Sequence, residues 1–175
     1  MNFTDKIVSF NQIININPND LSFVYMNIRS LRKHFNTFIV NIRPILYKLS
    51  IIILVETNIQ NEETQIYQIP NFSNVFLNRD SRGGGIAVYI RENINFTKTE
   101  INSKYYETLQ IDLSINNNKF TIFPIYRPPK LNVKHFINEL DNIINTINNK
   151  QNLILIGDIN IDTKKSKNKT TNFLL

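Results

Sequence analysis

Three short apolar runs, each closed by a polar side chain, constrain the fold of this chain more than any other feature. They are Leu21 to Met26, the run SIIILVET at 50 to 57, and the run NLILIGD at 152 to 158. A continuous, β-branched run of this length is typical of a strand that is buried on both faces. Such strands need other layers over both faces of their sheet, so the sequence predicts a covered α/β sheet.

Helical periodicity lies between these runs. From Ser30 to Leu49, apolar residues recur at helical spacing, which predicts a helix with Ser30 as its N-cap and a kink at Pro44. A second helix is predicted over 133–149, directly before the last apolar run. The chain therefore alternates between strands and helices.

The middle of the chain has a different pattern. GIAVYI at 85 to 90, INFTKTEI at 94 to 101 and ETLQIDLSI at 107 to 115 are shorter and partly alternating, as antiparallel strands are. Asn116 and Asn117 tolerate left-handed backbone and predict a hairpin turn into KFTIFPIY at 119 to 126. We therefore expect mixed sheets, with both parallel and antiparallel pairing.

Length and composition limit the class of protein. The 175 residues suffice for one domain, which we place at 21–162, between an Asn-rich leader at 1–20 and a basic tail at 163–175. A net charge of +6 and a pI near 9.5 favour polyanionic partners such as nucleic acid. Because cysteine is absent, disulfides, thiolate zinc sites and a catalytic thiol are excluded.

No secretion signal and no membrane-spanning run is evident in the sequence. We therefore expect an intracellular protein, nuclear or cytoplasmic, that is not secreted and has no membrane partner.

Polar side chains stand where the apolar runs end, which is where α/β sheets place their sites. Asn27, Glu56 and the pair Asp158 and Asn160 occupy these ends. In an extended segment the period of two would put Asp158 and Asn160 on one face, with Ile159 pointing into the core.

The four glycines are informative because the chain otherwise avoids glycine. They fall at 83–85 and at Gly157, so their backbone conformations are expected to be required. Gly157 would let the strand end bend or approach a neighbour closely. RGGG at 82 to 85 is not followed by GK[ST] and precedes a strand, which favours a turn over a phosphate-binding loop.

Each polar residue taken alone has a structural explanation, such as a turn, a cap or a half-buried core position. Five motifs taken together and in order are more specific: NIRSL at 27 to 31, LVET at 54 to 57, RGGGIAVY at 82 to 89, YRPP at 126 to 129 and GDIN at 157 to 160. This series resembles the endonuclease/exonuclease/phosphatase superfamily, and in particular the endonuclease domain of non-LTR (LINE-type) retrotransposons. The resemblance covers roughly Leu21 to Asp162.

The resemblance implies a four-layer α/β sandwich of two mixed β-sheets flanked by helices. It implies a DNA-nicking enzyme that uses Mg²⁺ or Mn²⁺ and forms no covalent intermediate. Hard oxygen ligands and the absence of cysteine agree with such an ion. A longer parent polyprotein would add a reverse transcriptase domain as a partner.

The resemblance also implies roles for single residues. Glu56 would bind the metal and Asn27 would support the metal or the phosphate. Asp158 would orient or deprotonate the attacking water. The remaining residues would contact the phosphate: Tyr126 by a hydrogen bond to the scissile group, Asn160 while fixing the geometry of Asp158, and Arg127 as an additional contact.

Two departures from the family pattern bear on activity. Asn58 stands where the family usually has Trp, which would weaken packing against the sheet. The family also has a further metal-binding Asp and an S-D-H motif downstream of GDxN, and neither is found before Leu175. His34 and His135 lie in the predicted helices and are expected at the surface. We therefore expect a C-terminally truncated domain, with its second half incomplete, that is weakly active or inactive.

Two alternatives to a nuclease remain. The chain could be a non-catalytic remnant that binds nucleic acid or protein through its basic surface. It could also be a phosphoesterase for a small phosphate ester, although the YRPP and RGGG motifs favour a DNA substrate.

Overall fold

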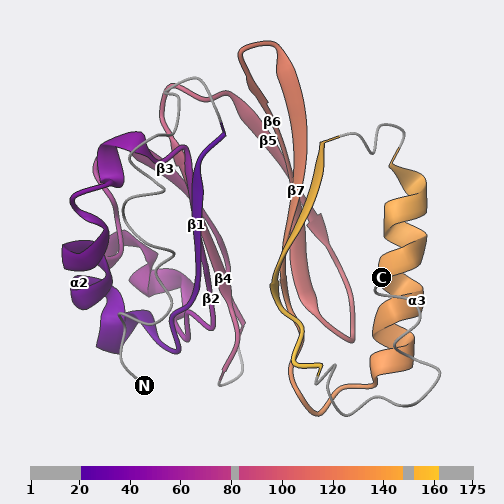
Figure 1. Ribbon diagram of the computed structural model, residues 1–175. Coiled ribbons are helices and arrows are strands. Elements are labelled where there is room, and N and C mark those ends of the chain that lie inside the picture. Colours follow the sequence, from indigo (N-terminus) through magenta and orange to yellow (C-terminus); the bar gives the residue numbers. More distant parts are fainter. Residues whose placement is uncertain (1–20, 80–82, 148–151, 162–175) are drawn as a thin grey trace.

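Two β-sheets face each other, and the outer face of each is covered by a described α-helix (Figure 1). The computed structural model describes residues 21–79, 83–147 and 152–161. Across the molecule the layers are α2, the first sheet, the second sheet and α3. Both sheets are mixed. This is the four-layer α/β sandwich that the family resemblance implies, and that expectation is confirmed.

The first sheet has the strand order β1-β2-β4-β3. Its strands are β1 (Phe23–Asn27), β2 (Ile51–Val55), β3 (Phe72–Leu77) and β4 (Ile86–Arg91). β1 and β2 are parallel, whereas β4 is antiparallel to both of its neighbours. Every residue of β2 is buried, because Ile52 and Leu54 pack towards α2 and the other three residues pack towards the second sheet. Burial on both faces explains the uninterrupted apolar run.

Helix α2 (Leu31–Ile42) covers the outer face of the first sheet and buries Phe38 and Ile42 there. The helix ends before Pro44 and a short 3₁₀ turn, η2 (Leu46–Lys48), follows, so the expected kink is instead a helix end. Ser30 does occupy the N-cap position. Its φ is 131° and its side chain makes no capping bond, so the predicted N-cap position is confirmed but the hydroxyl does not satisfy the helix end.

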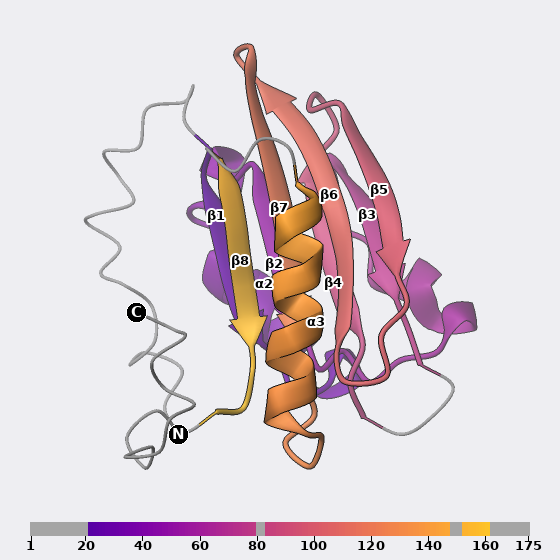
Figure 2. The same cartoon turned by 90° about the vertical axis from the view of Figure 1, so that its right-hand side faces the viewer.

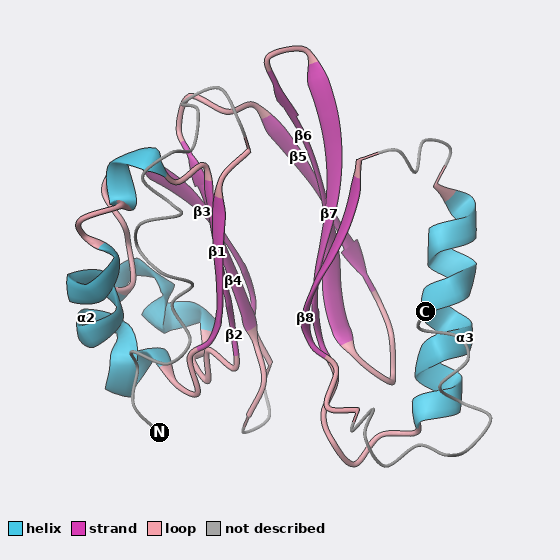
Figure 3. Cartoon of the chain, in the orientation of Figure 1, coloured by secondary structure: helices cyan, strands magenta, loops and turns pink. Residues whose placement is uncertain are grey.

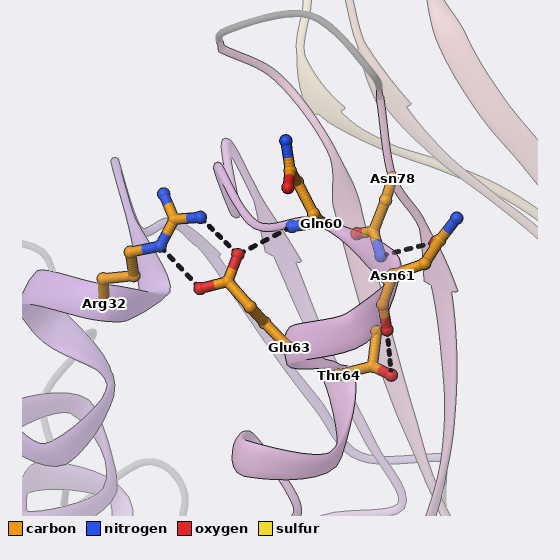
Figure 4. A network of polar contacts seen from close by, with 6 residues as sticks. All are labelled: Arg32, Gln60, Asn61, Glu63, Thr64 and Asn78. Carbon is orange, nitrogen blue, oxygen red and sulfur yellow. Dashed lines mark hydrogen bonds and ion pairs between the residues drawn. The ribbon is translucent and has the colours of Figure 1, made fainter.

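A second 3₁₀ segment, η3 (Asn61–Ile66), was not predicted and lies beside the start of α2 (Figure 4). Arg32 Nε donates to Glu63 Oε1 over 2.6 Å, and Glu63 Oε2 accepts from the backbone N–H of Gln60. At the other side, Asn78 Nδ2 donates to Asn61 Oδ1 over 3.1 Å. These surface contacts join α2, η3 and the end of β3.

The second sheet has the strand order β5-β6-β7-β8. Its strands are β5 (Phe96–Ile101), β6 (Glu107–Ile115), β7 (Asn118–Tyr126) and β8 (Leu153–Asp158). β7 and β8 are parallel and the other pairs are antiparallel. In β6, Leu109, Ile111 and Leu113 face the first sheet, which explains its alternating pattern.

The predicted hairpin turn between β6 and β7 is confirmed. Asn116 and Asn117 have φ values of 50° and 68°, the left-handed conformation that a tight two-residue turn requires.

We expect Asn117→Val to lower the free energy of unfolding by about 1–2 kcal/mol, because a β-branched residue is strained in this conformation. Asn117→Gly should not destabilise the protein. Urea denaturation of both variants checks this, and equal losses would show that the left-handed conformation at Asn117 is not what determines the stability of the turn.

Helix α3 (Val133–Thr146) covers the outer face of the second sheet (Figures 1 and 3). Its N-cap is Asn132, whose side chain accepts from the backbone N–H of His135. Phe136 is 1% exposed and packs with Phe123 and Ile125 of β7. The helical spacing of the apolar residues in α3 is therefore explained by their packing in this core.

β8 is less buried than its sequence suggests. It was predicted as a buried strand, but its residues are half-buried and Leu155 is 42% exposed. The reason is that β8 lies at an edge of the described second sheet, next to β1 at an edge of the first (Figure 2).

The chain directions bring four strand ends to one edge of the sandwich, at the lower end of Figure 1. Here β1, β2, β7 and β8 all finish.

Among the described residues, no helix is long and apolar enough to cross a membrane. The predicted leader at 1–20 and tail at 163–175 lie outside the described residues.

Candidate active site

Strand alternation directs Asn27 and Asp158 into the space between the two sheets. In β8, Ile154 and Ile156 pack between the sheets, so Asp158 two residues later lies on the same face. In β1, Tyr25 packs there, and Asn27 follows it by two residues. The sequence predicted the strand ends but not that they would come from different sheets.

The Asn27 amide joins the two carboxylates of the site. Its Nδ2 donates to Glu56 Oε1 over 2.8 Å and to Asp158 Oδ2 over 2.7 Å. Its Oδ1 accepts from the backbone N–H of Arg29 over 3.2 Å, which fixes the orientation of the amide. Both amide hydrogens are therefore used to hold carboxylates from opposite sheets.

Glu56 reaches Asn27 through an unusual backbone turn. Continued alternation along β2 would direct it towards α2, as it directs Ile52 and Leu54. Its φ is instead 58°, a conformation that costs a non-glycine residue on the order of 1–3 kcal/mol. Asn58 stabilises the turn by donating from Nδ2 to the Glu56 carbonyl over 3.2 Å. Such strain is concentrated at functional sites.

The loop after Glu56 is anchored on both sides. Thr57 and Asn58 donate their backbone N–H groups to the carbonyls of Gly85 and Gly84, and the Thr57 carbonyl accepts from Leu31. Asn58 occupies the position at which the family that the motifs resemble usually has Trp. It therefore belongs to the turn that orients Glu56. It also has φ 53°, which asparagine tolerates better than most residues.

Asn160 is held at the site by a turn, not by an extended strand. β8 ends at Asp158, and Asn160 has φ 51°, so the prediction that both lie on one face of an extended segment was wrong. The Asn160 backbone N–H donates to Asp158 Oδ1 over 3.1 Å, and its side-chain Nδ2 donates to the Arg127 carbonyl over 2.8 Å. Ile159 packs towards the α3 core, as expected.

Arg127 has a structural role in place of the phosphate contact that we expected. Its side chain is 1% exposed. Its guanidinium donates to the carbonyls of Ile159 and Asn160, over 2.5 and 2.6 Å, and to those of Leu131 and Pro128. With its donors directed at backbone carbonyls, it braces the turn after Asp158 and is not available to a substrate.

Tyr126 ends β7 directly beside Asp158 in the strand register. It is 7% exposed, and its hydroxyl has no hydrogen-bond partner among the described residues. Burial and the nearby carboxylates of Glu56, Glu107 and Asp158 raise the pKa of Tyr126 to about 12. The hydroxyl therefore stays protonated at neutral pH and is free to donate.

Three further residues belong to this neighbourhood, and sequence reasoning missed all of them. Tyr25 lies between the sheets, where burial and the charges of Asp158 and Glu56 raise its pKa. Glu107 begins β6 opposite Tyr126, and Arg79 forms an ion pair with it. The period-two pattern of β6 places Glu107 on the inner face, and this was the signal that could have found it.

Neither histidine takes part. His34 lies exposed on α2, and His135 lies exposed on α3, where its ring stacks on Tyr105. Because the chain has two histidines in all, no imidazole reaches the site. The expectation that both are surface residues is confirmed.

The donor set fits a hard divalent cation. Within the described residues, neither Glu56 nor Asp158 forms an ion pair, although the buried Arg127 guanidinium acts electrostatically on Asp158, and Glu56 Oε2 accepts no hydrogen bond. The described part of the chain contains no group of three or more His, Cys, Asp or Glu side chains that could hold a metal ion by themselves. Mg²⁺ is commonly held by one or two carboxylates with water and phosphate oxygens as its other ligands. Glu56, with Asp158 or Asn27, could supply that protein share.

The layers and strand order define the fold: the chain has the endonuclease/exonuclease/phosphatase fold. Among similar solved structures, the endonuclease domain of TRAS1, a telomere-specific non-LTR retrotransposon, aligns with a TM-score of 0.61 and 12% identity, over 87% of this chain and 67% of that one. The mannosyl-6-phosphatase Bt3783 of Bacteroides thetaiotaomicron aligns with a TM-score of 0.67 and 12% identity, over 89% of this chain and 70% of that one.

TDP2 from D. rerio, complexed with a single-strand DNA product, aligns with a TM-score of 0.60 and 14% identity, over 81% of this chain and 61% of that one. The chain thus spans less than two thirds of this structure's length. No protein-family model matches the sequence, and no curated protein matches it. These similarities establish the fold.

Proposed function

We propose that this chain is a metal-dependent phosphodiesterase domain that nicks DNA, derived from a non-LTR retrotransposon. One observation carries the proposal. The Asn27 amide holds the carboxylates of Glu56 and Asp158 from opposite sheets, and neither carboxylate forms an ion pair in the described part of the chain. Paired carboxylates that are not engaged in ion pairs are suited to a divalent cation and an activated water.

DNA is the substrate that the other observations favour. The chain carries a net charge of +6, which attracts a polyanion. Two proteins with this fold are a retrotransposon endonuclease domain and a TDP2 bound to a single-strand DNA product. The NIRSL, RGGGIAVY and YRPP motifs also resemble the retrotransposon endonucleases.

The proposed roles follow from the contacts. Mg²⁺ or Mn²⁺, when bound, supplies positive charge to the phosphate oxygens. Glu56 binds the metal, and Asn27 holds Glu56 and Asp158 at fixed positions. Asp158 orients the attacking water and accepts its proton, while Asn160 fixes the Asp158 carboxylate through its backbone N–H. The unpaired Tyr126 hydroxyl donates to a phosphate oxygen.

We expect this chain to nick DNA slowly. No histidine reaches the site, so stabilisation of the developing negative charge is left to the metal and Tyr126. A loss of one such donor costs about 10²–10³-fold in rate in other hydrolases. Weak nicking is therefore expected.

A supercoiled-plasmid nicking assay tests the function. With Mg²⁺ we expect slow conversion to the open circle, which EDTA stops. Glu56→Ala should reduce the rate about 100-fold, because it removes the proposed metal ligand. Glu62→Ala, a change of an exposed glutamate on η3, is the matched control and should nick like the wild type. Equal rates in all three proteins would remove the proposal.

A second candidate is a non-catalytic module that binds nucleic acid. The positive net charge and the absence of histidine from the site favour it. It predicts DNA affinity that falls steeply with added salt, with no nicking above the Glu56→Ala background. The same assay therefore separates the two functions.

A further inference from the structure

We propose that Arg79 binds a phosphate group of the substrate beside Tyr126, and that Glu107 is a positioning residue that holds the Arg79 guanidinium there. The proposal rests on the proposed function and names a recognition residue for it. Neither residue belongs to the motifs that the sequence singled out.

Glu107 lies on the inner face of the second sheet. It is the first residue of β6 and pairs with Tyr126 of β7 across the strand register. Leu109 and Ile111, which share its face, pack between the sheets. Its side chain is 12% exposed, so a third carboxylate lies close to the proposed reaction site.

Both oxygens of this carboxylate are fixed. Oε1 accepts from Arg79 Nη1 over 2.9 Å, and Oε2 accepts from the backbone N–H of Gly85 over 2.6 Å. Burial raises the pKa of Glu107, and the contacts with Gly85 and Arg79 oppose that effect. Glu107 thus joins β6 of the second sheet to the glycine segment and to the end of β3.

The glycines leave the space that this arrangement needs. A Cβ on Gly84 would lie 2.3 Å from Glu107 Oε1 and 2.9 Å from Arg79 Cδ. Gly84 also has φ 80°, which side chains rarely adopt. The requirement for glycine at this position is therefore explained by the carboxylate and guanidinium that lie against it.

Arg79 retains donors for a ligand. A guanidinium has five N–H donors, and among the described residues one bond, to Glu107, is made. Its side chain is 38% exposed. It acts electrostatically on Tyr126, where it opposes the effect of the three carboxylates on the pKa. Among the described residues, it is the cation that acts on Tyr126, and its positive charge would offset the repulsion of a phosphate by the carboxylates.

An ordinary surface ion pair does not explain this geometry. Exposed pairs contribute little to stability and need no buried partner. Here the carboxylate is only 12% exposed and is fixed by a backbone N–H, while the Arg79 side chain is 38% exposed. Guanidinium groups fixed in this way bind phosphate oxygens in a bidentate geometry, which a lysine cannot reproduce.

DNA binding tests the proposal without requiring cleavage. We would measure the anisotropy of a labelled oligonucleotide duplex with Ca²⁺ replacing Mg²⁺, over a range of NaCl concentrations. Arg79→Ala should weaken binding about tenfold and reduce the salt slope by about 0.9, as loss of one phosphate contact does. Arg79→Lys should recover part of the affinity. Arg32→Ala is the matched control, because Arg32 also pairs with a glutamate at the surface but lies on α2.

Glu107→Gln tests the positioning role. Glutamine cannot accept from both Gly85 and Arg79 in the observed arrangement, since its amide nitrogen is a donor. In the nicking assay we expect a raised KM with little change in kcat, and an unchanged thermal midpoint would exclude unfolding as the cause.

The outcomes separate this inference from the proposed function. Wild-type affinity in Arg79→Ala, an equal loss in Arg32→Ala, or no DNA binding by the wild type would each overturn it. If Arg79→Ala alone loses affinity while no protein nicks DNA above the Glu56→Ala background, the phosphate contact stands and the proposed function fails.

Discussion

Asp158→Asn is expected to lower the rate of DNA nicking about a thousandfold, because the substitution removes the carboxylate that we propose as the proton acceptor for the attacking water. The change is nearly isosteric. The amide oxygen that replaces Oδ1 could still accept from the backbone N–H of Asn160, a contact that now measures 3.1 Å. Initial rates of plasmid nicking with Mg²⁺ measure the effect.

The contact of Asp158 with Asn27 adds an expected loss of stability to the loss of nicking. Asn27 Nδ2 donates to Asp158 Oδ2 over 2.7 Å, and an amide nitrogen at that place would set a donor against a donor. We therefore expect a small loss of stability with the large loss of rate. Asp112→Asn, at a carboxylate on the outer face of β6 that contacts Gln110 and Thr121, is the control. A nicking rate within about threefold of the wild type would exclude Asp158 as the base.

Local patterns predicted most of the strands and helices, whereas the arrangement of two facing sheets was implied by the family resemblance. β2 was visible because five consecutive apolar residues are buried on both faces, and β6 because its alternation matches one buried face. β3 was missed: FSNVFL buries Phe72 and Val75 three positions apart, which is not the period of a strand. Its place is set by pairing with β4, which no local pattern encodes.

The site was predictable where strand ends determine it. Asn27, Glu56, Tyr126 and Asp158 stand at such ends, and parallel pairing within each sheet brings them to one edge. Side-chain direction was not predictable, because the φ of Glu56 is positive and departs from strand alternation. The roles of these residues stay predictions.

Arg127 and Arg79 show why residue type alone misleads. Arg127 adjoins Tyr126 in the sequence and suggested a phosphate contact, yet it is buried among backbone carbonyls. Arg79 had no motif to mark it, yet a carboxylate 28 residues away holds it beside the site. Contacts between distant segments decide which cation is accessible, and a single sequence does not contain them.

Gly157→Ala is expected to lower the free energy of unfolding by about 3 kcal/mol, a severe case of overpacking. The Cβ would lie 1.8 Å from the carbonyl oxygen of Ile125 and 2.8 Å from its nitrogen. These are backbone atoms of β7, so no flexible side chain can move aside. β8 would have to separate from β7, and Asp158, the next residue, would move with it. Urea denaturation and nicking rates together measure both effects.

Leu155→Ala is the matched control for Gly157→Ala, two positions earlier on the same face of β8. Leu155 is 42% exposed, so its truncation should change stability by less than about 1 kcal/mol and leave nicking intact. If Gly157→Ala unfolds at the same urea concentration as Leu155→Ala, β8 does not approach β7 as closely as described. If Gly157→Ala is destabilised but nicks normally at low temperature, the β8 end does not position Asp158. The two readouts therefore test separately whether this glycine is needed for packing and whether that packing sets the geometry of the site.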